Sequence, residues 1–207
     1  MKRWRWFLAM MVLGLALAGC SAEKKDEAKP PPGPYDAIGN GIGAGLAGCS
    51  VEDWDGSAIY DIGLAAERVT AAAEAAHRGP VHLVLTGRAE NHIHDRPDLA
   101  DTIARLQRYQ EAGADVLFAP GVLDIDDLRR LVGEVDRPVN VVAQPGCPPV
   151  SELAEIGVRR VSVGGLFTFA ALGAVVEAAT ELRDQGTFGY WDRAGTGARV
   201  ARPAFRE

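Results

Sequence analysis

The sequence predicts an α/β fold in which parallel strands alternate with helices. Two observations support it: five short apolar runs have strand character, and the segments between them have the hydrophobic spacing of helices. Five strand-helix pairs in succession favour a parallel sheet with right-handed crossovers, since each helix carries the chain back to the same end of the sheet.

The expected elements follow one another in a regular order. Strands are expected at 46–51, 82–86, 116–118, 139–142 and 160–163. Helices are expected at 61–77, 99–112, 125–134, 150–156 and 167–185. Asp98 is placed to cap the second of these helices, Gly113 to end it, and Pro138 to lead into a strand.

Composition is that of a globular protein rather than a disordered, collagenous or multispan membrane protein. The 207 residues are 47% hydrophobic and 24% charged, with a formal charge of −6. An acidic chain without a basic stripe repels phosphate backbones, and no zinc-finger or aromatic stacking motif is present. Nucleic acid is therefore not expected as a partner.

The N-terminus has the pattern of an export signal. Three basic residues precede an apolar run over 6–18, which is too short to span a bilayer comfortably. The run ends in Leu17-Ala18-Gly19-Cys20, which resembles a bacterial lipobox. That resemblance implies cleavage before Cys20, a lipid on its thiol and anchoring on the extracytoplasmic side of a membrane. A mis-assigned N-terminus, with a cytoplasmic protein, is the alternative.

Four segments are expected along the chain. Residues 1–19 are a lipoprotein-type signal peptide, 20–35 a polar, proline-rich tether, 36–189 the α/β domain and 190–207 a C-terminal tail. Cys49 and Cys147 are then the remaining thiols. They adjoin apolar strand-like runs, which favours buried free thiols, and a disulfide is the alternative in an oxidising compartment.

Polar residues follow the expected strands. Because ligands bind at the carboxyl ends of parallel strands, these residues are the candidates for a site. They are Glu52 and Asp53 after the first strand, Arg88, Glu90 and Asn91 after the second, Gln144 after the fourth and Gly164 after the fifth. Acidic, guanidinium and amide groups at one edge suit an anionic substrate and a hard cation.

Several motifs together resemble the isocitrate lyase and phosphoenolpyruvate mutase superfamily, over about residues 44–189. They are GLAGCSVED at 45–53, GRAEN at 87–91, EAGADVLFAPG at 111–121, PVNV at 138–141 and LAEIGVRRVSVG at 153–164. The resemblance implies a TIM-type barrel that makes or breaks a carbon–carbon or carbon–phosphorus bond beside a carbonyl. It also implies Mg²⁺, which stabilises an enolpyruvate-type anion on a small 2-oxo acid or phosphonate substrate.

The resemblance also assigns roles to the residues at the strand ends. Glu52 supports the magnesium ion, with Asp53 beside it. Arg88 holds the substrate's carboxylate or phosphonate and Glu90 orients Arg88, so both are catalytic candidates. Substrate-binding roles are expected for Arg88, Asn91, Gln144 and Gly164. A structural salt bridge between Glu52 and Arg88, and a turn cap at Asn91, are the alternatives.

Two family features are missing. An early strand carrying a run like D-x-D/E-x-G-Y-G does not occur, so the chain matches about strands four to eight and is expected to be an incomplete TIM-type (β/α) barrel. A loop like K-x-C-G-H is replaced by Trp54-Asp55-Gly56-Ser57. The two functions considered are a magnesium-dependent lyase or mutase and a non-catalytic, lipid-anchored protein built on the barrel fragment. Exposed sheet edges favour a homo-oligomer in either case.

The histidines have plainer interpretations. His92 and His94 stand two apart and could share a transition metal in an extended loop, against a substrate-loop or surface role. His77 is expected to close a helix, where positive charge is favourable. His82 is expected to begin a strand and to be structural.

Overall fold

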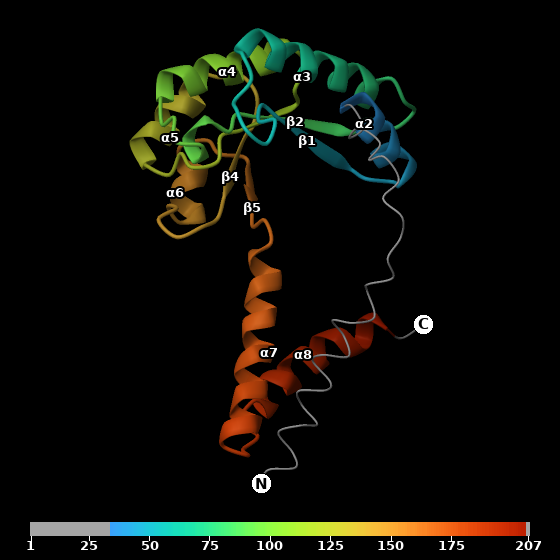
Figure 1. The fold of residues 1–207 in the computed structure, drawn as a ribbon, viewed down its shortest axis with the longest axis vertical. Coiled ribbons are helices and arrows are strands. Elements are labelled where there is room, and N and C mark those ends of the chain that lie inside the picture. Colours follow the sequence, from blue (N-terminus) through green and yellow to red (C-terminus); the bar gives the residue numbers. More distant parts are fainter. Residues whose placement is uncertain (1–33, 206–207) are drawn as a thin grey trace. The chain divides into compact units, whose positions relative to one another are not determined.

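The computed structural model describes residues 34–205, and a five-stranded parallel sheet forms their centre (Figure 1). The strands are β1 (Gly48–Glu52), β2 (Val84–Arg88), β3 (Val116–Phe118), β4 (Val139–Val142) and β5 (Arg160–Ser162). Their order in the sheet is their order in the chain, and every neighbouring pair is parallel. The predicted fold class is confirmed.

Helices follow the strands as predicted. They are α2 (Pro34–Gly43), α3 (Ile62–His77), α4 (Leu99–Glu111), α5 (Ile125–Gly133), α6 (Val150–Glu155), α7 (Leu166–Asp184) and α8 (Trp191–Ala204), with a short 3₁₀ turn η1 (Asn91–Ile93). All five expected helices form, and their ends move by a single residue at most. The Asp98 side chain accepts hydrogen bonds from the backbone N–H groups of Ala100 and Asp101, and Gly113 has a φ of 102° just beyond α4.

Some segments differ from expectation. Residues 36–44 lie mainly in α2, which begins at Pro34 inside the expected tether and packs on α3 through the buried Ile38. Proline is favourable in the first helical turn, because its missing N–H has no partner there in any case. The described part of the expected tail at 190–207 lies mainly in α8. His82 precedes β2 rather than beginning it. The signal peptide, Cys20 and the tether up to residue 33 lie outside the described residues.

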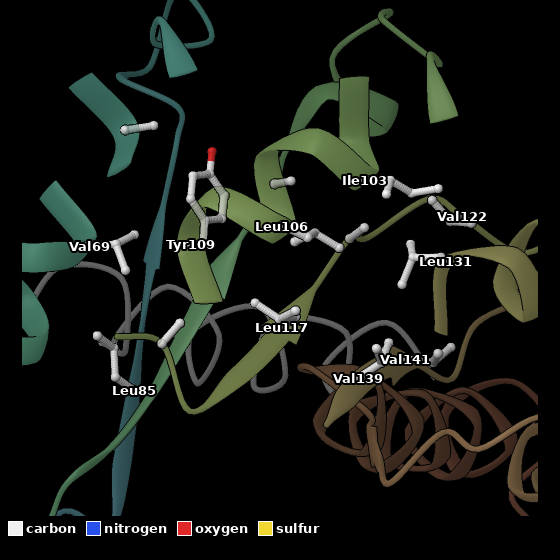
Figure 2. Close-up of a cluster of buried hydrophobic side chains, with 14 of the residues drawn as sticks. Val69, Leu85, Ile103, Leu106, Tyr109, Leu117, Val122, Leu131, Val139 and Val141 are labelled. Atoms are coloured by element: carbon white, nitrogen blue, oxygen red, sulfur yellow. The ribbon is translucent and has the colours of Figure 1, made fainter. Parts of the chain in front are cut away.

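The core lies between the sheet and one layer of helices. Figure 1 shows α3, α4 and α5 along the same face of the sheet, and Figure 2 shows how their side chains meet those of the strands. Strand residues alternate between two faces. The helix-facing set, all buried, is Leu85, Leu117, Val139 and Val141. Helices along one face are what a segment of a TIM-type barrel requires, since its other face is the barrel interior.

Helices α7 and α8 bury none of their side chains within the chain. An ion pair between Arg193 and Glu177, 2.7 Å, joins the two helices. No helix among residues 34–205 has the length and hydropathy to cross a bilayer. Cys49 and Cys147 are free, as predicted, but only half-buried; burial, with a smaller effect of Asp115, raises the pKa of the Cys49 thiol.

Candidate active site

The candidate site lies at the carboxyl ends of β1 and β2. Glu52 and Arg88 end these strands and are paired in register across the sheet. Parallel pairing points residues in register to the same face, and the Arg88 Nε atom lies 3.7 Å from Glu52 Oε2. Glu52 is 46% exposed, so this contact is a loose surface ion pair rather than a buried one.

Arg88 is held from one side of its guanidinium group. Its Nε donates to the carboxylate of Glu90, and the guanidinium lies 5.2 Å from the centre of the Phe118 ring. Within the described chain, its two terminal nitrogens have no hydrogen-bond partner. The side chain is 28% exposed. The edge formed by its two terminal nitrogens is therefore left for a ligand, and such an edge can bind carboxylate or phosphonate oxygens bidentately.

The buried carboxylate of Glu90 holds the Arg88 side chain in place. Its carboxylate is 3% exposed and also lies 3.3 Å from His94 Nε2. Its backbone N–H donates to Asp53 Oδ1 at 2.8 Å. The geometry therefore agrees with the orienting role that the resemblance gave Glu90, although it does not test catalysis.

Asp53 is a buried connector between β1 and α4. Its Oδ2 accepts hydrogen bonds from Tyr109 Oη at 2.6 Å and Arg105 Nη1 at 3.0 Å, while Oδ1 accepts from Glu90. Burial, reinforced by the neighbouring Asp53, raises the pKa of Tyr109 far above its usual range. Both carboxylate oxygens are thus occupied. A magnesium role for Asp53 stays a prediction, and the contacts seen are structural.

Asn91 takes the role of a turn cap. It is fully buried, and its Nδ2 donates to the backbone oxygens of Arg96 and Asp98, both at 3.2 Å, and to Thr102 Oγ1 at 2.7 Å. These bonds hold the 91–98 loop onto the start of α4. Substrate contact by Asn91 stays a prediction, because its amide already has this local use.

Gln144 and Gly164 lie at the ends of β4 and β5. The Gln144 carbonyl accepts a hydrogen bond from Cys147 N–H at 3.0 Å in a turn, and Gly164, with a φ of 53°, leads towards α7. The described contacts do not connect either residue to Arg88. Their substrate-binding roles also stay predictions.

A polar network on the barrel-interior face of the sheet was missed by the sequence reasoning. Arg160 donates from Nη2 to Thr86 Oγ1 at 2.8 Å and from Nε to Asn140 Oδ1 at 2.9 Å. Asn140 in turn donates to Ser162 Oγ at 3.0 Å. Burial lowers the pKa of Arg160. The available signal was the alternation of polar and apolar residues in β4 and β5, which marks a second, polar face.

The loops after β1 and β2 contact each other through two rings. Trp54 stacks on His94 with the ring centroids 3.7 Å apart and the planes within 10°. The β1 loop is itself braced, since Asp55 Oδ1 accepts hydrogen bonds from the backbone N–H groups of Ser57 and Ala58, each at 2.7 Å. His94 thus faces Trp54 and Glu90. Within residues 34–205, no metal-binding set of three side chains includes His92 or His94.

The described ends of β1 and β2 offer Mg²⁺ few side-chain donors. In proteins this ion takes one or two carboxylates, with water and substrate oxygens completing an octahedron. At the described ends of β1 and β2, Glu52 is the one exposed side-chain carboxylate, because Asp53 and Glu90 are buried and occupied. These residues alone therefore do not form a complete magnesium site.

Comparison with known proteins gives a consistent result. A family model described as phosphoenolpyruvate phosphomutase matches residues 31–183. A solved structure of a candidate lyase/mutase from Burkholderia cenocepacia is 43% identical and superposes with a TM-score of 0.79, covering 85% of this chain and 66% of that one.

Two curated relatives are similar over shorter stretches. An uncharacterized protein from Mycobacterium tuberculosis is 34% identical over 139 residues, which is 67% of this chain and 52% of that protein. Oxaloacetate decarboxylase 1 from Pseudomonas putida is 36% identical over 87 residues, 41% of this chain and 30% of that enzyme. The chain thus spans about half the length, or less, of these curated relatives.

Proposed function

Because the chain belongs to the phosphoenolpyruvate phosphomutase family, we propose that it binds a small 2-oxo acid or phosphonate and cleaves or forms a C–C or P–C bond beside its carbonyl. Relatives named as oxaloacetate decarboxylase support this substrate class, since oxaloacetate is such an acid. An enolpyruvate-type anion is the shared intermediate of such reactions, because the broken bond leaves its electron pair next to the carbonyl.

The single observation that supports this proposal most is the set of contacts that the Arg88 side chain makes. This strand-end arginine has Nε held by a buried carboxylate and a side chain that is 28% exposed, an arrangement that favours binding of an oxyanion. Binding the substrate carboxylate there would place the reacting carbonyl near Glu52. Positive charge on Arg88 would also stabilise the enolate that forms.

Magnesium dependence is a further part of the proposal. Members of this superfamily typically use a divalent metal ion, which would act as a Lewis acid on the enolate oxygen. Among the described strand-end residues, Glu52 is the one able to support such an ion. Its carboxylate is one ligand, so water and substrate oxygens would have to supply the others. The steps assigned to this chain are therefore substrate binding by Arg88 and orientation of Arg88 by Glu90.

A second candidate function is binding without catalysis. It is favoured by the donor set, since a single exposed carboxylate leaves a bound 2-oxo acid with little to polarise its carbonyl. In this case the chain would be a lipid-anchored protein that retains Arg88 as its ligand-binding group. Both candidates require Arg88, and turnover distinguishes them.

The experiment combines binding and turnover on the full chain. Oxalate, a planar dianion resembling an enolate, is the binding probe, and oxaloacetate and phosphonopyruvate are the test substrates, each with and without Mg²⁺. Substituting Arg88 alone would leave Glu90 buried without its cation, at a cost of several kcal/mol. The test variant is therefore Arg88→Met with Glu90→Gln. A second variant, Arg88→Lys, keeps the positive charge but loses the paired N–H donors of the guanidinium group.

We expect the double variant to lower kcat/KM and oxalate affinity at least about 100-fold, and Arg88→Lys to lower them about tenfold. Arg129→Met, on the exposed face of α5, is the control and should change neither. Oxalate binding without turnover of any substrate would support the non-catalytic candidate. If turnover or oxalate binding in both Arg88 variants equals that of the wild-type chain, both candidate functions are contradicted.

A further inference from the structure

A second side-chain cluster lies at the opposite ends of the strands, where β2 and β3 begin. His77 is the last residue of α3, His82 precedes β2, and Asp115 precedes β3. His77 Nε2 lies 2.9 Å from Asp115 Oδ2, and His82 Nε2 lies 3.2 Å from Asp115 Oδ1. The three donor atoms lie within 4.8 Å of one another. Parallel crossovers place this cluster at the other sheet edge from Arg88.

Backbone hydrogen bonds bring the three residues together. Leu85 N–H donates to Asp115 Oδ2 at 2.8 Å, while Asp115 N–H donates to the Leu85 carbonyl, also at 2.8 Å. Leu83 N–H donates to the Ala76 carbonyl at 3.2 Å, which closes the turn between the two histidines. The carboxylate is thus oriented by β2, and both rings are attached to the ends of one short turn. An ion bound there would find its ligands largely pre-positioned.

We propose that His77, His82 and Asp115 bind a divalent transition-metal ion at the amino-terminal edge of the sheet. Two imidazole nitrogens and one carboxylate oxygen are the donor set of three-ligand zinc sites, in which water takes the fourth position. The ion would join the α3–β2 turn to the start of β3. This site is independent of the proposed function, because it shares no residue with the Glu52 and Arg88 edge.

The distances fit a tetrahedral ion. Zinc bonds to nitrogen or oxygen of roughly 2.0 to 2.1 Å place tetrahedral donors about 3.3 Å apart. The two His-to-Asp115 separations, 2.9 Å to Oδ2 and 3.2 Å to Oδ1, are each close to that value, and each histidine faces a different carboxylate oxygen. The imidazole rings are stacked, with planes within 7° and centroids 4.3 Å apart, so binding requires one ring to turn towards the ion. His82 is 56% exposed and has the room to turn.

Without an ion, the same three side chains contact one another. A neutral His77 donates from Nε2 to Asp115 Oδ2 at 2.9 Å, and His82 Nε2 lies 3.2 Å from Asp115 Oδ1. On binding, the ring proton moves to Nδ1 and the Nε2 lone pair goes to the ion. The change needs no proton release from a neutral histidine.

Zinc affinity of the full chain, measured by competition with a chromophoric chelator, tests the proposal. We expect about one zinc ion per chain and a loss of affinity of at least tenfold in His82→Gln and in His77→Gln. His82→Gln removes one exposed ring and is the variant least able to disturb folding. Zinc should also raise the Tm of the wild-type chain, by mass action on the folded state, and not that of His82→Gln.

Two controls separate this cluster from the candidate active site. Glu52→Gln and His94→Gln alter the opposite sheet edge and should leave zinc affinity and the zinc-dependent rise in Tm unchanged. The proposal is overturned if His82→Gln binds zinc as the wild-type chain does. It is equally overturned if affinity is lost in Glu52→Gln or His94→Gln instead, or if no zinc binds at about 100 μM free ion.

Discussion

Asp53 shows how one buried carboxylate organises the candidate site. It receives hydrogen bonds from Tyr109, Arg105 and the Glu90 backbone, and so links β1, α4 and the end of β2. Glu90 in turn holds Arg88. Asp53 is therefore connected to Arg88 through one residue, Glu90.

Tyr109→Phe tests the strength of this link. Removing the hydroxyl deletes a 2.6 Å hydrogen bond to a buried charge, so we expect the free energy of unfolding to fall by about 1.5 to 3 kcal/mol. Asp53→Asn should cost more, about 3 to 5 kcal/mol, because Arg105 then loses its buried counter-charge. Urea unfolding measures both. Tyr190→Phe is the control and should leave the free energy of unfolding unchanged. If Tyr109→Phe also leaves it unchanged, the hydrogen bond to Asp53 contributes nothing to stability.

His92 predicts a pH dependence of stability. Burial lowers its pKa, against the smaller, opposite effects of Asp127 and Asp98, and its Nε2 is buried without a hydrogen-bond partner. The unfolded chain then takes up a proton near pH 6.5, whereas the folded chain does so only at lower pH. This part of the free energy of unfolding is therefore present above about pH 6.5 and is lost as the pH falls towards the lowered pKa.

Urea unfolding between about pH 5 and pH 7.5 measures this effect in wild type and His92→Gln. The loss of stability on acidification should be smaller in the variant, since the two proteins differ in this group alone. A variant whose stability follows that of the wild-type chain across the whole range would mean that burial of His92 carries no such cost.

At the scale of residues, the sequence located the strand-end set but not its supports. Glu52, Arg88 and Glu90 were found because strand ends of a parallel sheet meet at one edge. Arg105 and Tyr109 lie 52 and 56 residues from Asp53, and no local spacing signals such distant contacts. The metal role predicted for Asp53 rested on sequence adjacency to Glu52, whereas alternation turns the two side chains to opposite faces.

Gly87 sets the distance between β2 and α4. A Cβ atom at this position would lie 2.9 Å from Tyr109 Cβ and 3.2 Å from Ala114 Cβ. We expect Gly87→Ala to force the helix outward and to lower the free energy of unfolding by about 1 to 3 kcal/mol. The shift would also lengthen the hydrogen bond from Tyr109 to Asp53, so oxalate affinity should fall as well.

Gly133→Ala is the matched control for this prediction. A Cβ atom there meets nothing within 4 Å, and its φ is not positive, so the substitution should be neutral or stabilising by about 0.4 to 1 kcal/mol. Thermal unfolding of the two variants compares them directly. Equal Tm values would indicate that α4 can retreat from β2 without cost.

At the scale of elements, local signals predicted the repeating units well and the ends of the domain poorly. Asp98 and Gly113 marked the limits of α4 because capping is a local, side-chain-to-backbone interaction. The glycines at 39, 41 and 43 argued against a helix, so α2 was not predicted. Its formation depends on the packing of Ile38 against α3. Tertiary packing there outweighs the low helix propensity of glycine.

Helix α7 provides the prediction for the whole molecule. Phe169, Leu172 and Val176 recur at helical spacing and are all largely exposed, although such a stripe is normally buried. We expect the full chain to self-associate through this stripe, with a light-scattering mass that is a multiple of 22.0 kDa. Homo-oligomer formation was also expected from the exposed sheet edges.

A paired substitution makes this prediction specific. Phe169→Glu with Val176→Glu should shift the mass towards that of the monomer, because charge opposes burial of the stripe. Val150→Glu is the control, since Val150 on α6 is as exposed as Val176, both at 64%. A monomeric wild-type chain, or dissociation by Val150→Glu alone, would contradict a contact through α7.

The braced loop between β1 and α3 has a consequence for kinetics. Trp54 stacked on His94, with Asp55 closing the turn behind it, holds the loop after β1 against the loop after β2, which carries Glu90. Ligand encounter is then set by diffusion and charge steering, and residence time by the contacts of the bound anion.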